Sequence, residues 1–391
     1  MTNWKIVPFH TLFHRLQKRT GFPDEELLSV YRDYGVIHKS DRDDNFNRPG
    51  DLSDYQLVER GDLVLNKMKT WQGSLGISPH RGIVSPAYFV YKPVSKNDER
   101  FLHYALRCRD AIDYYASHST GIRVNQWDLN PEWLDVMPVA LPDIETQRRI
   151  ADYLDKEISE MNELIENLEE LVKNLEERKS LLIDDIIYNS KDEIKLAPLG
   201  LFLAEPITDG PHETPEFIDE GIPFLSVDGI QNGELVFDNC RFISQKDHDR
   251  FSKKAKPRKN DILMGKAAST GKIALVKTDR EFNIWSPLAI IRPNNNIDPR
   301  WLTLVLKSPF SQRQINDLST FNTQKNIAMG DIPRLKIPVI NLNDQKEVAD
   351  HLDKEIEYMD SLIDNCSKLI ELLKERKTVL ISEVVAGRKE V

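Results

Sequence analysis

The chain of 391 residues has few cysteines and no long hydrophobic stretch. Cys108, Cys240 and Cys366 lie far apart, so neither a disulfide framework nor a cysteine-based zinc site is expected. No run of about eighteen apolar residues occurs, which argues against a transmembrane helix. The segment Met1–Leu12 lacks the apolar core of a secretory signal. These absences predict a cytoplasmic protein that makes no contact with a membrane.

Patterns typical of an enzyme active site are also lacking. Gly265–Lys272 resembles a phosphate-binding loop, but its glycines are spaced too widely, and Ile273 stands where Ser or Thr would bind magnesium. Asn130–Trp133 resembles the Asn-Pro-Pro-Tyr loop of base-modifying methyltransferases but lacks its second proline. The nine histidines form no HxH or HExxH pattern. We therefore expect no catalytic residue and no metal site in this chain.

The net charge of −10 is distributed unevenly along the chain. Residues 1–140 are neutral and residues 194–340 carry +3, whereas residues 141–193 carry −9 and residues 341–391 carry −4. The two larger blocks can therefore hold basic patches despite the acidic total. The same boundaries define the predicted organisation: a first domain (1–140), a central long helix (141–193), a second domain (194–340) and a C-terminal long helix (341–391).

An internal repeat underlies this organisation. The segment QRRIADYLDKEISEMNELI, which starts at Gln147, matches QKEVADHLDKEIEYMDSLI, which starts at Gln345, at a constant offset of 198. Upstream, Asp98–Leu102 matches Asp298–Leu302 at an offset of 200. The chain is therefore two copies of one unit, a mixed domain followed by a long helix. The sequence between these landmarks differs strongly, which indicates one scaffold that presents two different surfaces.

The two long helices are predicted to pair with each other. Apolar residues in both recur at alternating spacings of four and three, which is typical of a coiled coil. The predicted seam consists of Leu154, Ile158, Met161, Ile165 and Leu168 in the first helix and Leu352, Ile356, Met359, Ile363 and Ile370 in the second. Because the second domain connects the end of one helix to the start of the other, the pair should be antiparallel. The predicted fold class is α+β, with two globular domains separated by this helix pair in pseudo-two-fold symmetry.

Several polar loops contain side chains suited to nucleic acid. Lysine suits phosphate or guanine, and glutamine suits adenine. The candidates in the first domain are Lys67, Lys69, Trp71, Gln72, Ser74, Arg123 and Asn125. The candidates in the second domain are Thr208, Asp209, His212, Lys266, Ser269, Thr270, Lys272, Thr323 and Lys325. A solvated hairpin tip is the alternative for the first loop. The basic run Lys253–Lys259 fits a phosphate grip and a solvated linker equally well.

Taken together, these features resemble the specificity (S) subunit of type I restriction-modification systems. The resemblance rests on the domain–helix–domain–helix order, on the repeated Gln-x-x-[Ile/Val]-Ala-Asp-x-Leu-Asp-Lys-Glu-Ile start of each helix, and on the Glu-Arg-Lys near each helix end. Four further segments resemble the family: Lys67–Ser78, Pro138–Leu141, Thr208–His212 and Pro338–Leu342. One departure is Phe321, which stands where the first copy has Gly121 and the family often has glycine.

The resemblance implies that each domain is a target-recognition domain that reads one half of a bipartite site in double-stranded DNA. The helices, up to about 65 Å long at ~1.5 Å per residue, would set the gap between the half-sites. They would also dock two methyltransferase (M) subunits, and motor-nuclease (R) subunits would join the complex. S-adenosylmethionine, ATP and magnesium would belong to those partners, so this chain would bind no cofactor and perform no catalysis. The alternative is a two-headed coiled-coil adaptor that binds proteins.

Overall fold

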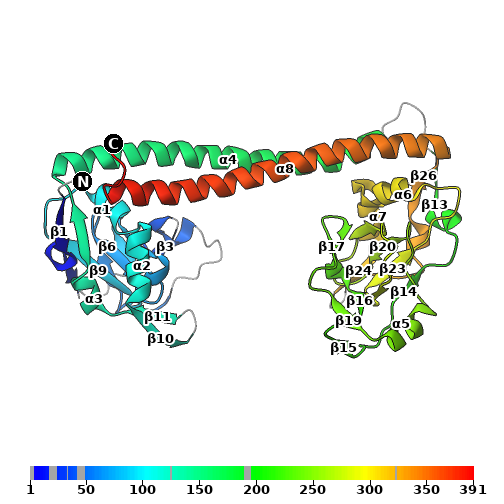
Figure 1. Ribbon diagram of the computed structural model, residues 1–391, viewed down its shortest axis with the longest axis horizontal. Coiled ribbons are helices and arrows are strands. Elements are labelled where there is room, and N and C mark those ends of the chain that lie inside the picture. The colour runs from blue at the N-terminus through cyan, green and yellow to red at the C-terminus, as the bar shows by residue number, and fades with distance from the viewer. Residues whose placement is uncertain are drawn as a thin grey trace. The chain divides into compact units, whose positions relative to one another are not determined.

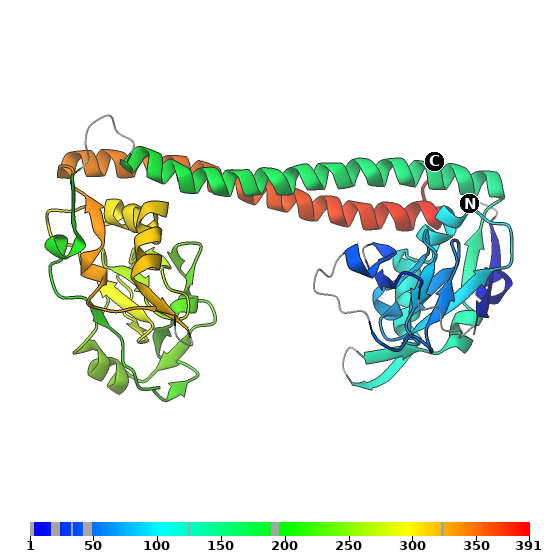
Figure 2. The ribbon, with the colours of Figure 1, turned by 180° about the vertical axis from the view of Figure 1, so that it is seen from behind.

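The computed structural model describes residues 4–16, 24–32, 34–41, 49–123, 126–188, 195–321 and 324–391, without the side chains of residues 122, 123 and 126. The chain divides into two compact units. Unit 1 is Met1–Glu169 with Ser367–Val391, and unit 2 is Glu170–Cys366. The division passes through both long helices, α4 (Ile144–Tyr188) and α8 (Leu342–Val385) (Figures 1 and 2). Each unit therefore contains a globular domain and a part of both helices.

Unit 1 is built on a four-stranded antiparallel sheet with the order β2-β9-β6-β7. Four antiparallel pairs surround it, namely β1-β12, β3-β4, β5-β8 and β10-β11. The strands are β1 (Lys5–Pro8), β2 (Phe13–Leu16), β3 (Leu28–Tyr31), β4 (Gly35–His38), β5 (Gln56–Val58), β6 (Leu63–Asn66), β7 (Leu75–Ile77), β8 (Gly82–Val84), β9 (Tyr88–Pro93), β10 (Ser119–Arg123), β11 (Gln126–Leu129) and β12 (Pro138–Leu141). The short helices are α1 (Glu99–Ala105), α2 (Arg109–Ser117) and α3 (Pro131–Asp135).

Unit 2 repeats the main sheet and two of the strand pairs of unit 1 and differs in its other strands. Its main antiparallel sheet has the order β14-β23-β20-β21, which corresponds to β2-β9-β6-β7, and its pairs β13-β26 and β24-β25 correspond to β1-β12 and β10-β11. A second sheet, β15-β19-β16-β22, contains one parallel pair, and a hairpin pairs β17 with β18. The strands are β13 (Leu196–Pro198), β14 (Thr208–Asp209), β15 (Phe217–Ile218), β16 (Ile222–Leu225), β17 (Ile230–Gln231), β18 (Glu234–Leu235), β19 (Arg241–Ile243), β20 (Ile262–Gly265), β21 (Ile273–Leu275), β22 (Asn283–Ile284), β23 (Leu288–Ile291), β24 (Ser319–Phe321), β25 (Lys325–Ile327) and β26 (Lys336–Pro338). The helices are α5 (Gln245–Ser252), α6 (Pro299–Lys307) and α7 (Pro309–Leu318).

A buried glutamine joins each domain to the first turn of its long helix. In unit 1, Gln147 accepts a hydrogen bond from the Asp98 backbone N–H at 2.9 Å and donates to the Pro142 carbonyl at 3.0 Å. In unit 2, Gln345 makes the same contacts with Asp298 at 2.8 Å and Ile340 at 2.9 Å. Both glutamines are 2% exposed. The repeated glutamine therefore satisfies buried backbone groups that would otherwise be unpaired.

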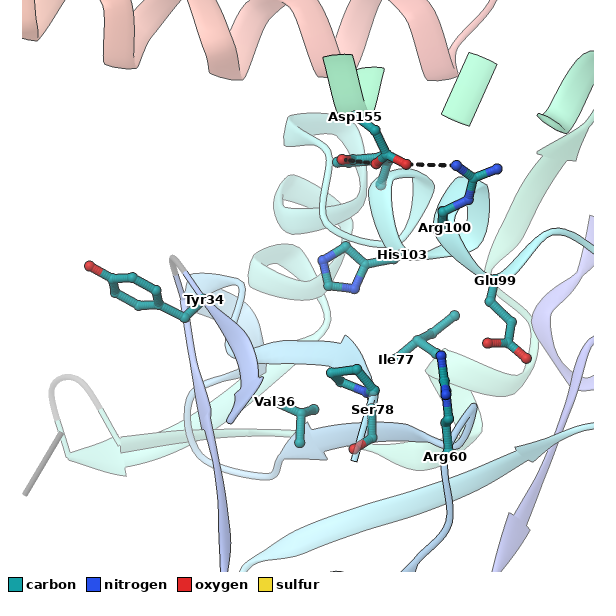
Figure 3. A pocket seen from close by; sticks show the side chains of 11 residues that line it. Tyr34, Val36, Arg60, Ile77, Ser78, Glu99, Arg100, His103 and Asp155 are labelled. Atoms are coloured by element: carbon teal, nitrogen blue, oxygen red, sulfur yellow. Dashed lines mark hydrogen bonds and ion pairs between the residues drawn. The ribbon is translucent and has the colours of Figure 1, made fainter. Parts of the chain in front are cut away.

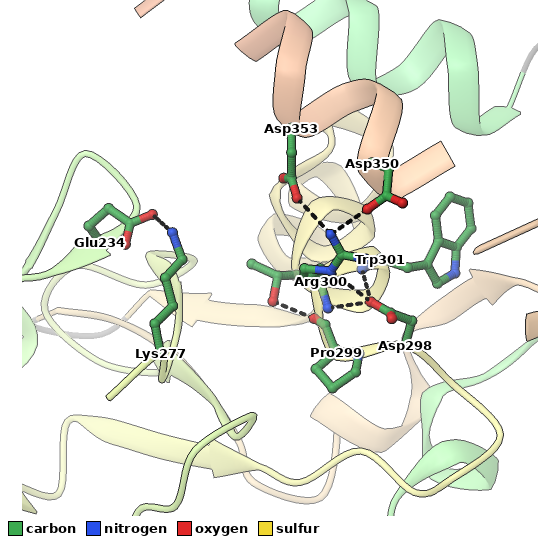
Figure 4. Close-up of polar contacts among 9 residues, drawn as sticks. Glu234, Lys277, Asp298, Pro299, Arg300, Trp301, Asp350 and Asp353 are labelled. Atoms are coloured by element: carbon green, nitrogen blue, oxygen red, sulfur yellow. Dashed lines mark hydrogen bonds and ion pairs between the residues drawn. The ribbon is translucent and has the colours of Figure 1, made fainter. Parts of the chain in front are cut away.

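The repeated aspartates of the helix starts clamp one arginine in each unit. In unit 2, Arg300 Nη1 lies 2.7 Å from Asp350 and 3.3 Å from Asp353, and Asp298 caps α6 through the backbone N–H groups of Arg300 and Trp301 (Figure 4). In unit 1, the corresponding pairs join Arg100 to Asp152 at 2.8 Å and to Asp155 at 2.7 Å. These ion pairs are partly exposed and individually stabilise by about 0–1 kcal/mol. Together they orient α1 and α6 on the long helices.

The helix pair is antiparallel within each unit. In unit 1, Lys377 contacts Asn162 at 3.0 Å and Lys374 contacts Glu169 at 3.1 Å, so the residue numbers rise on α4 as they fall on α8. In unit 2, the salt bridge between Lys179 and Asp360 joins the two helices. Of the predicted seam residues, the structure buries Leu154, Met161, Ile165, Leu352, Met359 and Ile370 and half-buries Ile158, Leu168, Ile356 and Ile363. The predicted α+β class with antiparallel long helices is confirmed.

The core of each domain continues into its helices. Phe101 of α1 belongs to the same apolar cluster as Leu154 of α4 and Leu373 of α8. In unit 2, Trp301 of α6 shares a cluster with Ile183 of α4 and Leu352 of α8. The long helices are therefore part of the hydrophobic core of each unit, and their placement depends on the domain as well as on the seam.

The Gln345→Ala substitution should test the role of the buried glutamine. It removes the side chain that pairs with the Asp298 N–H and the Ile340 carbonyl, and leaving such buried groups unpaired costs about 1–3 kcal/mol. We expect a decrease of this size in the free energy of unfolding, measured by urea denaturation. Gln231→Ala is the control, because Gln231 is exposed and bonds only to the nearby Asp228 carbonyl. Equal stability of the two variants would contradict the assigned role.

Candidate nucleic-acid interface

The loop that follows β6 in unit 1 is a compact turn with an exposed lysine. Its chain reverses through a 3-10 turn, Thr70–Gln72, and through Gly73, which has a φ of 91° that favours glycine. The Ser74 N–H donates to the Lys69 carbonyl at 3.1 Å and closes the turn. The Lys69 side chain is exposed and has no ion-pair partner among the described residues. The backbone of the turn therefore presents the Lys69 ammonium to solvent.

Two tryptophans join this loop to the β10-β11 hairpin. The ring centroids of Trp71 and Trp127 lie 4.7 Å apart at an interplanar angle of 43°, and both side chains are half-buried. The Trp71 indole N–H donates to the Met68 carbonyl at 3.0 Å. The hairpin lies at the end of the domain that is distant from α4 and α8 (Figure 1). Trp127 is not one of the predicted site residues. In the sequence it stands out only as an aromatic residue close to the polar candidates Arg123 and Asn125.

Lys67 and Ser74 support the loop from within the fold. The Lys67 ammonium donates to the Pro86 carbonyl at 2.5 Å and lies 4.7 Å from the centroid of the Phe89 ring. The Ser74 hydroxyl is buried and donates to the Val30 carbonyl at 3.0 Å. The Ser74 hydroxyl thus already donates to a partner within the fold, and its contact with DNA stays a prediction. Gln72 remains half-buried in the turn.

The corresponding loop of unit 2 is attached by hydrogen bonds to the backbone of its hairpin. The Ile327 N–H donates to the Lys266 carbonyl at 2.9 Å, and the Thr270 hydroxyl donates to the Lys325 carbonyl at 2.8 Å. The loop ends at Gly271, whose φ of 93° matches that of Gly73 in unit 1. Both units therefore dock the same loop on the same hairpin, through aromatic rings in unit 1 and through the backbone in unit 2.

A buried carboxylate collects three basic side chains beside this loop. Asp209 lies 2.6 Å from the Lys254 ammonium, 3.1 Å from the Lys266 ammonium and 3.1 Å from His212 Nε2. Burial opposes ionisation of Asp209, but the hydrogen bonds from Lys254 and Lys266 outweigh it and lower the pKa of Asp209. Two ammonium groups around one carboxylate leave a net positive cluster. The predicted site residues include Asp209, His212 and Lys266, whereas Lys254 is predicted only as part of the basic run Lys253–Lys259.

The remaining predicted residues of unit 2 have local partners or lie outside the described residues. The Lys272 ammonium donates to the Ile230 carbonyl at 3.1 Å, and the Lys325 ammonium contacts the Asn316 side-chain oxygen. Thr208 and Ser269 are half-buried. The side chain of Arg123, and all of Asn125 and Thr323, lie outside the described residues.

The basic run Lys253–Lys259 is largely neutralised by acidic neighbours. Lys256 pairs with Glu281 at 2.6 Å, Lys259 pairs with Asp279 at 3.0 Å, and Arg258 lies 3.5 Å from Glu205. This arrangement favours the interpretation of the run as a solvated segment. Lys254 is the member of the run that points to the Asp209 cluster.

A separate pocket of about 280 Å³ lies in unit 1 between α1, β7 and the start of α4 (Figure 3). His103 faces it, and His103 Nε2 accepts a hydrogen bond from the Arg107 guanidinium at 2.6 Å, which places the ring proton on Nδ1. Burial, and to a smaller extent the charge of Arg107, lowers the pKa of His103 to about 3. The Arg100–Asp155 ion pair closes one side of the pocket. Sequence reasoning did not identify this pocket.

The described parts of the chain show neither a metal site nor a membrane-spanning helix. No group of three or more His, Cys, Asp and Glu side chains is placed to hold a metal ion there. Nor does any helix in these parts combine the length and the apolar character needed to cross a bilayer.

Comparison with known proteins finds similarity to type I restriction enzyme specificity subunits. A family model described as the type I restriction modification DNA specificity domain matches residues 213–372. The EcoBI specificity subunit of Escherichia coli is 30% identical over 40% of this chain, and the StySPI specificity subunit of Salmonella potsdam is 26% identical over 43% of it. These alignments span only 33% and 37% of those two type I restriction enzyme subunits. The MjaVIII specificity subunit of Methanocaldococcus jannaschii is 22% identical over 100% of this chain and 93% of that protein.

Solved structures agree at the level of the fold. A chain from a structural study of complex assembly in the type I R-M system has a TM-score of 0.74 at 16% identity, covering 98% of this chain and 97% of that chain. The HsdS subunit of Thermoanaerobacter tengcongensis has a TM-score of 0.58 at 16% identity, covering 99% and 97%. The fold is thus that of an HsdS-type protein with two α+β domains and long helices. The chain is thus similar in sequence to type I restriction modification DNA specificity domains over residues 213–372, and similar in fold to an HsdS subunit over nearly its whole length.

The low pKa of His103 predicts a pH dependence of stability. The ordinary pKa of histidine is about 6.5, so between that value and pH 3 the unfolded chain binds a proton that the folded chain excludes. The contribution of neutral His103 to the free energy of unfolding is complete above about pH 6.5. It decreases as the pH falls, by up to about 1.4 kcal/mol per pH unit. His103→Gln should therefore lose less stability than the parent chain between about pH 7 and 5, as measured by urea unfolding. The control is His351→Gln, which replaces an exposed histidine of α8 and should show the same change of stability with pH as the parent chain. If the stability of His103→Gln changes with pH in parallel with the parent, the low pKa of His103 is refuted.

Proposed function

We propose that this chain is the DNA sequence-specificity subunit of a type I restriction-modification complex, in which each domain reads one half of a bipartite site in double-stranded DNA. The observation that carries the proposal is the loop–hairpin assembly, which both units build from the same topology with different side chains. Such a pair of divergent surfaces on one scaffold suits two different half-sites. Contacts to base edges specify sequence, and contacts to phosphates position the protein.

The chemistry at each assembly supports contact with DNA. Unit 1 offers the exposed ammonium of Lys69 beside the Trp71–Trp127 pair. Unit 2 offers the net positive cluster of Lys254 and Lys266 around Asp209. The Lys254 side chain is half exposed, so its ammonium can face a phosphate while Lys266 keeps the buried Asp209 carboxylate paired.

The long helices supply surfaces for partner proteins in this proposal. Their acidic character disfavours phosphate and suits protein docking. Apolar side chains that gather on an exposed surface mark interaction sites. The exposed apolar residues of the long helices are Ile144, Leu164, Leu369, Leu372 and Val379 in unit 1 and Leu171, Leu181 and Tyr358 in unit 2. We assign these helices to docking two methyltransferase subunits and to setting the gap between the half-sites.

Catalysis belongs to the partners in this proposal. The methyltransferase subunits would bind S-adenosylmethionine, and the motor-nuclease subunits would bind ATP and magnesium. This chain would contribute target choice alone, within an assembly that acts on DNA in the cytoplasm.

The proposal is tested by a binding selection from randomised duplex DNA. The chain is co-purified with its methyltransferase partner and presented with the library at low salt, where phosphate contacts are strongest. We expect enrichment of two short blocks separated by a fixed gap. An intact complex that enriches no sequence would refute DNA specificity and favour the protein-binding adaptor.

Lys69→Ala should weaken DNA binding by the complex without affecting its assembly. Loss of one phosphate contact lowers the affinity for all duplexes and reduces the slope of log K against log salt by about one. A uniform loss with the smaller slope therefore identifies a phosphate contact, and a loss confined to one base pair of the selected site identifies a base contact. Lys96→Ala is the matched control, since Lys96 is an exposed lysine of the same unit that lies between β9 and α1, away from the loop and outside the long helices. Equal binding by the two variants would remove Lys69 from the interface.

A further inference from the structure

Phe321, on strand β24 of unit 2, is 80% exposed, more than any other large apolar side chain among the described residues. Leaving a phenylalanine in water forfeits the stabilisation that burial of its apolar surface would give. The side chain contributes to none of the apolar clusters of unit 2. The exposed Phe321 ring therefore lacks the stabilisation that packing against apolar side chains of its own domain would give.

The backbone around Phe321 holds the ring in place. Phe321 pairs directly with Lys325 in the antiparallel β24-β25 register. On its other edge, β25 bonds to the loop after β20, through the Ala267–Asn326 bridge and the Ile327 N–H. The loop, β25 and β24 thus form three adjoining segments, and the aromatic ring projects from the outermost one.

The surroundings of Phe321 are polar and include a cation. Lys325 stands on the same face of the hairpin, because directly paired residues in an antiparallel ladder share a face. Thr320 and Asn326 form the adjacent pair and are exposed. A protein-docking surface is typically a contiguous apolar patch, whereas one aromatic ring among polar and cationic groups suits nucleic acid, where the ring meets bases and the cation meets phosphate.

We propose that Phe321 inserts into the base stack of the DNA half-site bound by unit 2, with Lys325 beside it at the backbone. The inference rests on the proposed function and adds a mode of recognition to it. Apolar wedges that enter a base step unstack it and bend the duplex, and the energy of that deformation depends on the sequence of the step. Unit 2 thus reads the deformability of its half-site, and unit 1, with Gly121 at the corresponding position, reads its half-site without a wedge from this hairpin.

The test uses the complex of the full chain with its methyltransferase and duplexes of the selected sequence. 2-Aminopurine, which brightens when it is unstacked, replaces one adenine at a time across both half-sites. With the parent chain we expect brightening at one step of the half-site bound by unit 2, apart from any base that a methyltransferase flips out of the stack. Phe321→Ala should abolish the signal and weaken binding by about ten-fold or more, in line with the loss of one base-stacking contact. Phe321→Trp keeps an aromatic ring and should retain both properties.

Leu201→Ala is the matched control, because Leu201 is 67% exposed in the same unit and lies outside the hairpin. It should bind and brighten the DNA as the parent does. The proposal is overturned if Phe321→Ala retains affinity and the fluorescence signal, or if it instead releases the methyltransferase in the absence of DNA, which would make Phe321 a protein contact. If the parent complex binds no duplex, the proposed function itself is refuted. If it binds the selected duplex without brightening it, only the insertion of Phe321 is refuted.

Discussion

The contact on which the rest of each unit depends is the buried glutamine near the start of its long helix. The side-chain amides of Gln147 and Gln345 bridge the segment before the helix and the N-terminus of α1 or α6. A buried amide with backbone partners on two sides tolerates little displacement, because any shift leaves a polar group unpaired. The glutamine therefore sets where the helix leaves the domain, and the aspartate–arginine clamp beside it sets the orientation of the neighbouring helix. This is why the helix start repeats so closely while the rest of the domain diverges.

Once the helix start is placed, the far end of the domain is free to vary. Both units dock the loop after the central strand on a following hairpin, but they do so by different interactions. Unit 1 uses the contact between Trp71 and Trp127, and unit 2 uses hydrogen bonds to the backbone of the hairpin. Because these hydrogen bonds use the hairpin backbone, the side chains of the hairpin need not pack against the loop. This freedom allows Phe321 to point into solvent in unit 2, while the aromatic ring of the unit 1 hairpin packs on the loop.

Charge in the sequence is a poor guide to charge on the surface of this protein. The densest basic run, Lys253–Lys259, faces Glu281, Asp279 and Glu205, so most of its charge is compensated locally. Lys69, in a loop with only one other lysine, is exposed and has no such compensation among the described residues. The potential that a polyanion meets is a sum over neighbours in space, and neighbours in space come from strands and loops that are distant in sequence.

The sequence by itself determined the repeat, the α+β class, the antiparallel helices and most of their seam, because these follow from periodic patterns and from the connection between helices. It also identified the loops at 67–74 and 266–272. It did not reveal that Ser74 is buried, that Trp127 meets Trp71, that Lys254 joins Asp209, or that His103 faces a pocket. Each of these depends on a contact between residues more than twenty positions apart in the chain or on burial by several strands, and no local pattern encodes such a contact. The tertiary structure alone decided which polar side chains have partners within the fold and which remain available to a ligand.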